Sequence, residues 1–175
     1  MIDKIISEKV TTIQSDLLTG IMKGSTLLGD KYLIAFLSLI LIIFLIKNKQ
    51  YIKNKIFILA MGSGVILSQL LKETIKRARP AQILIEKDGF SFPSGHATFA
   101  TTFFGMLIFL FKDKIKNPKL KIAFISGNIF LILLVSFSRI YLNVHWLTDI
   151  LSGLIIGTIC IFFSIIIIEN IPYLN

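Results

Sequence analysis

The sequence predicts an all-α integral membrane protein: a helical bundle of five to six transmembrane helices, preceded by an N-terminal interfacial amphipathic helix. The first observation is composition. The chain has 175 residues, of which 54% are hydrophobic and 17% charged, and its mean hydropathy is +0.80, whereas soluble domains carry about 25% charged residues. The second observation is five long apolar runs, which leave too little polar sequence to coat a soluble core.

Composition also excludes several other classes of protein. A disordered chain has low hydrophobicity, and a nucleic-acid-binding domain with the net charge of +9 seen here would be polar. The single cysteine rules out a disulfide scaffold. Charges at Asp3, Lys4, Glu8 and Lys9 interrupt the apolar core that a cleavable signal peptide needs. We therefore expect one membrane-embedded domain over residues 1–175.

Residues 1–30 differ from the spans that follow. Apolar residues recur there at intervals of three and four, at Ile2, Ile6, Val10, Ile13, Leu17 and Ile21. This spacing predicts a helix that lies in the membrane interface, with a sixth, short span as the alternative. Gly24, Ser25, Gly29 and Asp30 break the pattern, and Asp30 is placed to cap the first span.

Five apolar runs follow and are read as spanning helices: Tyr32–Ile46, Ile56–Leu71, Ala97–Phe111, Ile122–Phe137 and Ile150–Ile168. Four of them fall short of the roughly 17 to 25 residues of a typical span, so buried helices of a soluble protein are the alternative. Flanking lysines can extend such spans by snorkelling. On the last run, Gly153 and Gly157 form a small-residue face that favours packing against a neighbouring helix of the same chain.

Two short connections are rich in lysine. They contain Lys47, Lys49, Lys53 and Lys55 after the first span, and Lys112, Lys114, Lys116, Lys119 and Lys121 after the third. The positive-inside rule places both in the cytoplasm. With five spans, the remaining polar residues at helix ends then face the outer side, and charges at a membrane edge mark a functional site by default.

The first polar group is Lys72, Lys76 and Arg79, followed by Pro80. If the second helix continues past Leu71, the spacings of four and seven residues place all three cations on one face, which suits a phosphate group. The alternative is a basic cluster that touches lipid headgroups. Because Lys76 shares this face, we expect it to contact a second phosphate or headgroup.

The second group is Ser94, Gly95 and His96, directly before an apolar helix. Ser94 is a good N-cap, and a helix start binds anions through its free N–H groups. His96, on the first turn, is placed to protonate a leaving oxygen. Taken alone, this tripeptide is more often a cap than a catalyst.

The third group is Arg139, His145 and Asp149. On a helix, residues four apart face each other, so Asp149 can hold the imidazole tautomer that leaves the other nitrogen of His145 free as a nucleophile. A capping aspartate beside an interfacial histidine is the alternative.

Together these residues resemble the three-part signature of the type 2 phosphatidic acid phosphatase family. The matching pattern, within residues 72–149, is Lys72-x6-Arg79-Pro80, then Pro93-Ser94-Gly95-His96, then Ser138-Arg139-x5-His145-x3-Asp149. The apolar spans are similar to those of the membrane lipid phosphatases in this family. Members commonly have six spans, which differs from the interfacial N-terminal segment expected here.

The resemblance implies a metal-independent lipid phosphatase that needs no cofactor. It implies that Lys72, Arg79, Ser94, Gly95 and Arg139 bind phosphate, and that His145, oriented by Asp149, forms a phosphohistidine while His96 protonates the leaving group. Fixed cations take the place of a metal ion in this scheme, and no carboxylate cluster suited to magnesium is seen in the sequence.

The substrates implied are undecaprenyl diphosphate, phosphatidylglycerophosphate or phosphatidic acid, with lipid A 1-phosphate as an alternative. We therefore expect a phospholipid or polyprenyl phosphate as the ligand, and no nucleic acid or obligatory protein partner. The expected location is a bacterial cytoplasmic membrane, with the active site on the extracytoplasmic side. The competing function is a non-enzymatic module that binds or carries anionic lipid.

Overall fold

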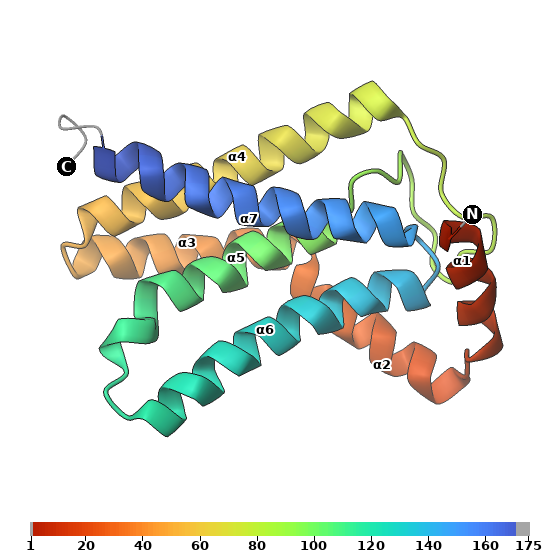
Figure 1. Ribbon diagram of the computed structural model, residues 1–175, viewed down its shortest axis with the longest axis horizontal. Coiled ribbons are helices and arrows are strands. Elements are labelled where there is room, and N and C mark those ends of the chain that lie inside the picture. The colour runs from red at the N-terminus through yellow and green to blue at the C-terminus, as the bar shows by residue number, and fades with distance from the viewer. Residues whose placement is uncertain (1, 171–175) are drawn as a thin grey trace.

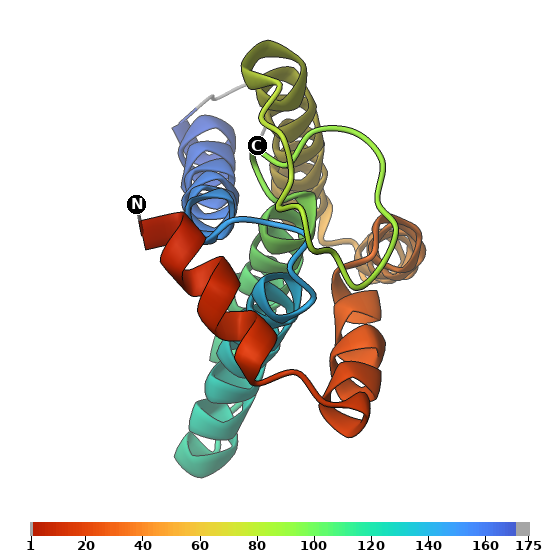
Figure 2. The same ribbon diagram turned by 90° about the vertical axis from the view of Figure 1, so that its right-hand side faces the viewer.

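The computed structural model describes residues 2–170, and all regular structure in this range is helical. The order is α1 (Ile2–Thr12), α2 (Asp16–Thr26), η1 (Leu27–Gly29), α3 (Lys31–Lys47), α4 (Tyr51–Ile75), α5 (Gly95–Phe111), η2 (Lys112–Lys114), α6 (Pro118–Tyr141) and α7 (Leu147–Asn170). Helices α3 to α7 form an elongated bundle, and α1 lies across one end of it (Figures 1 and 2). The prediction of an all-helical membrane bundle is confirmed.

Each of the five apolar runs lies within one helix, and several helices extend beyond the run. Four helices, α4 to α7, are long and apolar enough to cross a membrane within the described range. The first run, Tyr32–Ile46, lies in α3, which satisfies the same test together with α2 and η1 as a pair bent by 44°. The expected range is five to six spans, so the count of five, with the bent pair taken as one span, agrees with its lower end, whereas the count of four falls below it. Helices α2 and α3 thus follow each other with only a short break and a bend, so together they can form one broken span.

The prediction of one N-terminal amphipathic helix is wrong in detail, because the segment forms two helices. Ser15 caps α2 by accepting a hydrogen bond from the Leu18 amide at 3.4 Å, and this cap separates α2 from α1. Gly24 does not break the helix but lies inside α2. Asp30 caps α3 as expected, since its Oδ1 accepts from the Tyr32 amide at 2.9 Å.

Helix α5 lies at the centre of the bundle. Its buried residues include Ala97, Ala100, Phe103 and Met106, which pack against α4, α6 and α7. Helix α7 approaches α5 through the predicted small-residue face. A Cβ atom at Gly153 would come within 2.7 Å of the Ser94 oxygen, and one at Gly157 within 2.9 Å of the Thr98 oxygen. This close packing inside the chain confirms the expectation for the two glycines and brings the first turns of α5 and α7 together.

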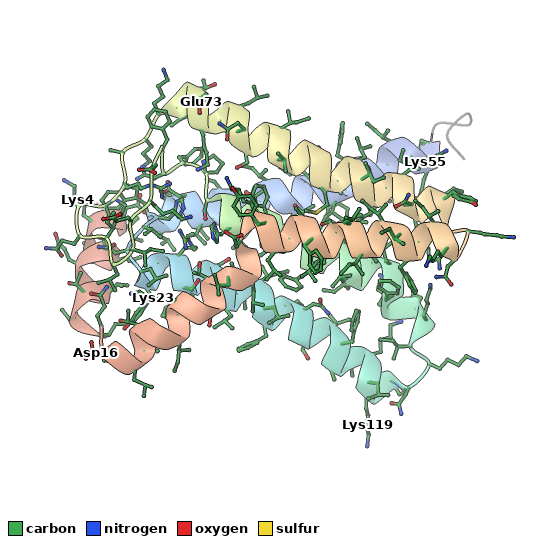
Figure 3. All side chains as sticks on the ribbon, turned by 180° about the vertical axis from the view of Figure 1, so that it is seen from behind. Lys4, Asp16, Lys23, Lys55, Glu73 and Lys119 are labelled. Carbon is green, nitrogen blue, oxygen red and sulfur yellow. The ribbon has the colours of Figure 1, made fainter. Side chains whose placement is uncertain are left out.

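The two lysine-rich connections lie at one end of the bundle, and the loops that carry the polar groups lie at the other. Lys55 and Lys119 mark the first end, whereas Glu73, Lys4 and Lys23 mark the second (Figure 3). Helix α1, the α4–α5 loop and the α6–α7 turn all gather at the second end (Figure 2). The chain thus separates its two lysine-rich connections from its candidate site by the length of the bundle.

Candidate active site

A cavity of about 850 Å³ opens between α3, α4 and α5. One part of its wall is apolar and comes from α3 and α4, with Ile34, Ile42, Met61, Val65 and Ile66. The other part is mainly basic and comes from several elements, with Lys31, Lys72, Arg79, Lys87, His96, Arg139 and His145 beside the carboxylates Asp30 and Asp88. The cavity therefore combines an anion site with a groove of hydrocarbon, as an amphiphilic ligand requires.

Arg139 on α6 has an exposed fraction of 1%, yet only part of its guanidinium group is paired. Its Nη1 donates to Thr26 Oγ1 at 2.6 Å. Among the described residues, its Nε and Nη2 have no hydrogen-bond partner. Unsatisfied N–H donors on a buried cation are costly, so an anionic ligand is the partner that this geometry calls for.

The expected basic face of the second helix is wrong. Helix α4 ends at Ile75, and Lys76 adopts the left-handed conformation with φ of 51° as its C-cap. The chain then leaves the helix direction, so Lys76 points to the exterior and is not part of the cavity wall, whereas Lys72 and Arg79 are. The expected contact of Lys76 with a second phosphate therefore loses its geometric basis.

Lys72 and Arg79 both hold the loop that connects α4 with α5. Lys72 Nζ donates to the main-chain oxygens of Pro93 at 2.8 Å and Phe90 at 3.1 Å. Arg79 donates from Nε to the Gly89 oxygen at 3.1 Å, and from Nη2 to the oxygens of Asp88 and Phe90, each at 3.1 Å. Both cations are thus fixed at the polar end of the cavity.

The first turn of α5 provides a second anion-binding feature. Ser94 caps the helix, with its Oγ accepting from the Ala97 amide at 3.4 Å, and Gly95 and His96 line the cavity. Ser94 is also anchored to α7, because its amide donates to the Asp149 main-chain oxygen at 3.0 Å. The positive end of the α5 dipole therefore faces the basic end of the cavity.

His145 lies in the turn before α7, not on the helix as predicted. Its Nδ1 is 2.7 Å from the Ser91 main-chain oxygen, which can only accept, so Nδ1 carries the proton. Its Nε2 then holds the lone pair and lies 3.3 Å from Nη1 of Arg79. His145 lines the cavity, so the nitrogen with the lone pair lies at its basic end beside the Arg79 guanidinium.

Asp149 is close to His145 but makes its strong hydrogen bonds elsewhere. Its Oδ2 is 3.5 Å from His145 Nδ1 and accepts from the Trp146 amide at 2.9 Å. Its Oδ1 accepts from Arg77 Nη1 at 2.6 Å. The expected carboxylate–imidazole pair is present as a long contact, and the tautomer is held by Ser91 instead.

Burial lowers the pKa of His145 from its ordinary value of 6.5 to about 4. The nearby cations Arg139, Arg79 and Lys72 act in the same direction, and the Asp149 carboxylate opposes them. Burial also lowers the pKa of Arg79, which still leaves its guanidinium charged. His145 is therefore a neutral base at neutral pH beside a permanent cation.

All the signature residues predicted for catalysis and phosphate binding gather at one end of the helical bundle. A family model described as the PAP2 superfamily matches residues 53–172, which contain all of them. The chain belongs to the PAP2 superfamily. The PAP2 match covers α4 from residue 53 onward, α5 with His96 on its first turn, and the turn before α7 that carries His145.

The relatives with which this PAP2 chain aligns are lipid phosphatases by name. It is 32% identical over 164 residues to phosphatidylglycerophosphatase B of Bacillus subtilis (strain 168), covering 91% of this chain and 80% of the relative. It is 30% identical over 155 residues to undecaprenyl-diphosphatase of Sulfolobus acidocaldarius, covering 85% and 69%. The crystal structure of a transmembrane PAP2 type phosphatidylglycerolphosphate phosphatase from Bacillus subtilis superposes with a TM-score of 0.87 at 28% identity, covering 99% of this chain and 87% of that one.

Four residues of this PAP2 site were not found by sequence reasoning. Lys31 and Lys87 line the cavity, Ser91 accepts from His145, and Arg77 binds Asp149. Ser91 accepts through its main-chain oxygen, which every residue type has, so the amino-acid sequence cannot indicate this role. Arg77 lies inside the first motif. A helix that continued past Ile75 would place Arg77 on a different face from Lys72 and Lys76, so nothing in the sequence pattern indicates its place at the site.

Proposed function

We propose that the protein is an integral-membrane lipid phosphatase that hydrolyses the phosphomonoester or diphosphate of a lipid through a phosphohistidine. The observation that carries this proposal is that a neutral, buried His145 lines the same cavity as the Arg139 guanidinium, whose Nε and Nη2 have no hydrogen-bond partner within residues 2–170. A nucleophile beside an oxyanion site is the minimum that phosphoryl transfer needs.

In the first step, the lone pair on His145 Nε2 attacks phosphorus, and the bond from phosphorus to the leaving oxygen breaks. His96, at the cavity end of α5, supplies the proton that this oxygen takes up. In the second step, water attacks phosphorus, the Nε2–phosphorus bond breaks, and inorganic phosphate leaves. His96 accepts the proton of the water, which restores the starting state.

Phosphate binding is assigned to Lys72, Arg79, Arg139 and the start of α5 with Ser94 and Gly95. The fixed cations neutralise charge that develops on the phosphoryl oxygens, which is the main catalytic demand of this reaction. Asp149 assists by supporting His145, with Ser91 sharing that role. Within residues 2–170 there is no cluster of three His, Cys, Asp or Glu side chains able to hold a metal ion. Each step of this scheme is assigned to a residue of the chain itself.

A lipid is the substrate class because the basic end is continuous with the apolar wall formed by α3 and α4. An acyl or polyprenyl chain would lie along Ile34, Ile42 and Val65 while its phosphate reaches Arg139. Phosphatidylglycerophosphate, undecaprenyl diphosphate, phosphatidic acid and lipid A 1-phosphate all have this shape. Lys31 and Lys87, at the basic end, would contact the part of the headgroup beyond the reacting phosphate.

We place the protein in a bacterial cytoplasmic membrane with its active site on the extracytoplasmic side. The support is the separation of the two lysine-rich connections from the candidate site (Figure 3). Clusters of lysine in short loops favour the cytoplasmic side, so the opposite bundle end would face outward.

The test is phosphate release by purified protein in detergent with EDTA, measured on a panel of the four lipids named above. The proposal predicts release from at least one lipid, and loss of release in His145→Ala and His96→Ala. If the wild type binds anionic lipid but releases no phosphate from any of them, the non-enzymatic lipid-binding or lipid-carrying function replaces it. Activity that requires a metal ion would retain the phosphatase but contradict the mechanism.

A further inference from the structure

Arg77 joins three parts of the chain through one side chain. Its Nη1 donates to Asp149 Oδ1 on α7 at 2.6 Å, and its Nη2 donates to Asp3 Oδ2 on α1 at 2.6 Å. Its guanidinium also lies over the ring of Trp146, 5.4 Å from the centroid. Asp149 has no exposed side-chain surface, whereas Arg77 is 30% exposed. The cation therefore covers the buried carboxylate from outside.

Asp3 uses both carboxylate oxygens at this junction. Its Oδ1 accepts from the Thr148 amide at 3.0 Å, and its Oδ2 accepts from Thr148 Oγ1 at 2.7 Å in addition to Arg77. Burial raises the pKa of Asp3, but the hydrogen bonds from Arg77 and Thr148 outweigh it and hold the pKa below the usual value. An ionised Asp3 thus attaches α1 to the start of α7.

The main chain of Arg77 supports His145 by a second route. The Arg77 oxygen accepts from the Ser91 amide at 2.8 Å and from Ser91 Oγ at 3.2 Å. The Ser91 oxygen in turn accepts from His145 Nδ1. One residue therefore fixes both groups that contact the protonated nitrogen of the nucleophile, the Ser91 carbonyl through its backbone and the Asp149 carboxylate through its side chain.

We propose that Arg77 is a positioning residue for the attack by His145, and that Asp3 on α1 acts through Arg77. This inference rests on the proposed phosphatase function. Arg77 and Asp3 are not part of the cavity wall, so neither contacts the substrate. Their loss should change the turnover step and leave substrate binding unchanged.

The first test measures kcat and KM for Arg77→Met, Asp3→Asn and the double variant, using the lipid that the wild type hydrolyses best. We expect kcat of Arg77→Met to fall by about tenfold or more, as for loss of a hydrogen bond between charged groups, with KM unchanged. Asp3→Asn should lose less, and the double variant should match Arg77→Met, because Asn keeps an oxygen that can accept from the Thr148 amide and so loses chiefly the ion pair with Arg77. Losses that multiply in the double variant would overturn the role of Asp3.

Matched controls remove the same charges from the exposed surface of α1. Glu8→Gln and Lys4→Gln lie on the same helix as Asp3 and should retain wild-type kcat. Arg77→Lys retains the charge but loses the two-pronged geometry, so it should recover part of the lost rate if its fold is intact. A kcat for Arg77→Lys as high as that of the wild type would contradict positioning by the guanidinium fork.

The second test is the acid limb of kcat/KM, which a purely structural role would not move. His145 is faced by Lys72 from α4, His96 from α5, Arg139 from α6, and Asp149 from α7, with Arg79 from the loop. Arg77→Met removes a cation from Asp149, so the carboxylate stabilises the imidazolium better, and the limb should move up by about one pH unit. A limb that stays in place or moves down would overturn the inference.

Failure of the proposed phosphatase function and failure of the positioning role of Arg77 would give different results. If the wild type releases no phosphate from any lipid, the proposed function fails before Arg77 is tested. If the wild type is active and His145→Ala is inactive while Arg77→Met keeps wild-type kcat, the phosphatase function stands and the positioning role of Arg77 is rejected.

Discussion

His145 hydrogen-bonds through Nδ1 to the main-chain oxygen of Ser91 at 2.7 Å, while the Asp149 carboxylate lies 3.5 Å from the same nitrogen. A carbonyl oxygen accepts and never donates, so this contact alone selects the tautomer with a free Nε2. The carboxylate adds a favourable charge but does not select the tautomer. Ser91 therefore selects the tautomer of His145 and Asp149 supplies the negative charge, and these separate roles lead to the first prediction.

Replacing Asp149 with Asn should reduce kcat by about ten- to hundredfold, less than replacing His145. The Ser91 contact keeps the tautomer, but the carboxylate no longer stabilises the imidazole as it gains a phosphoryl group. His145→Ala should lose about a thousandfold or more. Steady-state phosphate release compares the two variants, and equal losses would show that Asp149 holds the tautomer after all.

Arg139→Met should lower kcat/KM by about a hundredfold or more without lowering thermal stability. The buried guanidinium has two groups that lack partners within the described chain, so its removal costs little folding free energy but takes away a main contact of the phosphate. Differential scanning fluorimetry with inorganic phosphate checks this. Phosphate should raise the melting temperature of the wild type and not that of Arg139→Met; an equal rise in both would place the anion elsewhere.

The acid limb of kcat/KM should lie near pH 4, because the pKa of His145 is lowered to about 4 by burial. The rate should therefore be insensitive to the ionisation of His145 between about pH 5 and 7. A limb near 6.5 would show that His145 is solvated in the free protein.

The same shift predicts a dependence of stability on pH. The unfolded chain titrates His145 near 6.5 and the folded chain near 4, so the unfolded state binds more protons between these values. Stability from this group is present above pH 6.5 and is lost as the pH falls toward 4. Thermal unfolding of His145→Gln should show a weaker loss over this interval than the wild type, and an identical loss would contradict the shift.

Lys87→Met should weaken the binding of a lipid diphosphate more than that of a lipid monophosphate, since Lys87 lines the basic end of the cavity. We expect a rise in KM of about tenfold for undecaprenyl diphosphate and little change for phosphatidic acid. Lys76→Met is the matched comparison, because it removes an exposed lysine outside the cavity. A larger effect at Lys76 than at Lys87 would favour the helical face predicted from sequence over the turn seen here.

Periodicity and local chemistry predicted most of the fold. The apolar runs marked the five long helices, Asp30 marked a cap, and Gly153 and Gly157 marked a close helix contact. These features depend on residues near one another in sequence. The break between α1 and α2 was missed because the apolar spacing continues across it, and only the cap at Ser15 separates the two helices.

Prediction of the site failed where the backbone changes direction. The prediction continued α4 past Ile75, which placed Lys76 on the catalytic face and Arg77 away from it. The left-handed turn at Lys76 instead leaves Lys76 exposed and brings Arg77 to Asp149. Continuing α7 back to His145 likewise suggested a direct pairing with Asp149. Contacts between distant segments, such as Asp3 with Arg77, depend on how α1 folds over the bundle end and leave no local pattern.

The most direct test of the central claim is to quench the protein in alkaline SDS during turnover of a lipid labelled with ³²P at the reacting phosphate, using the His96→Ala variant alongside the wild type. A protein-bound label that is stable in base, labile in acid and absent from His145→Gln would confirm the phosphohistidine. Phosphate release by His145→Gln at the wild-type rate, with no such label on the active wild type, would contradict it.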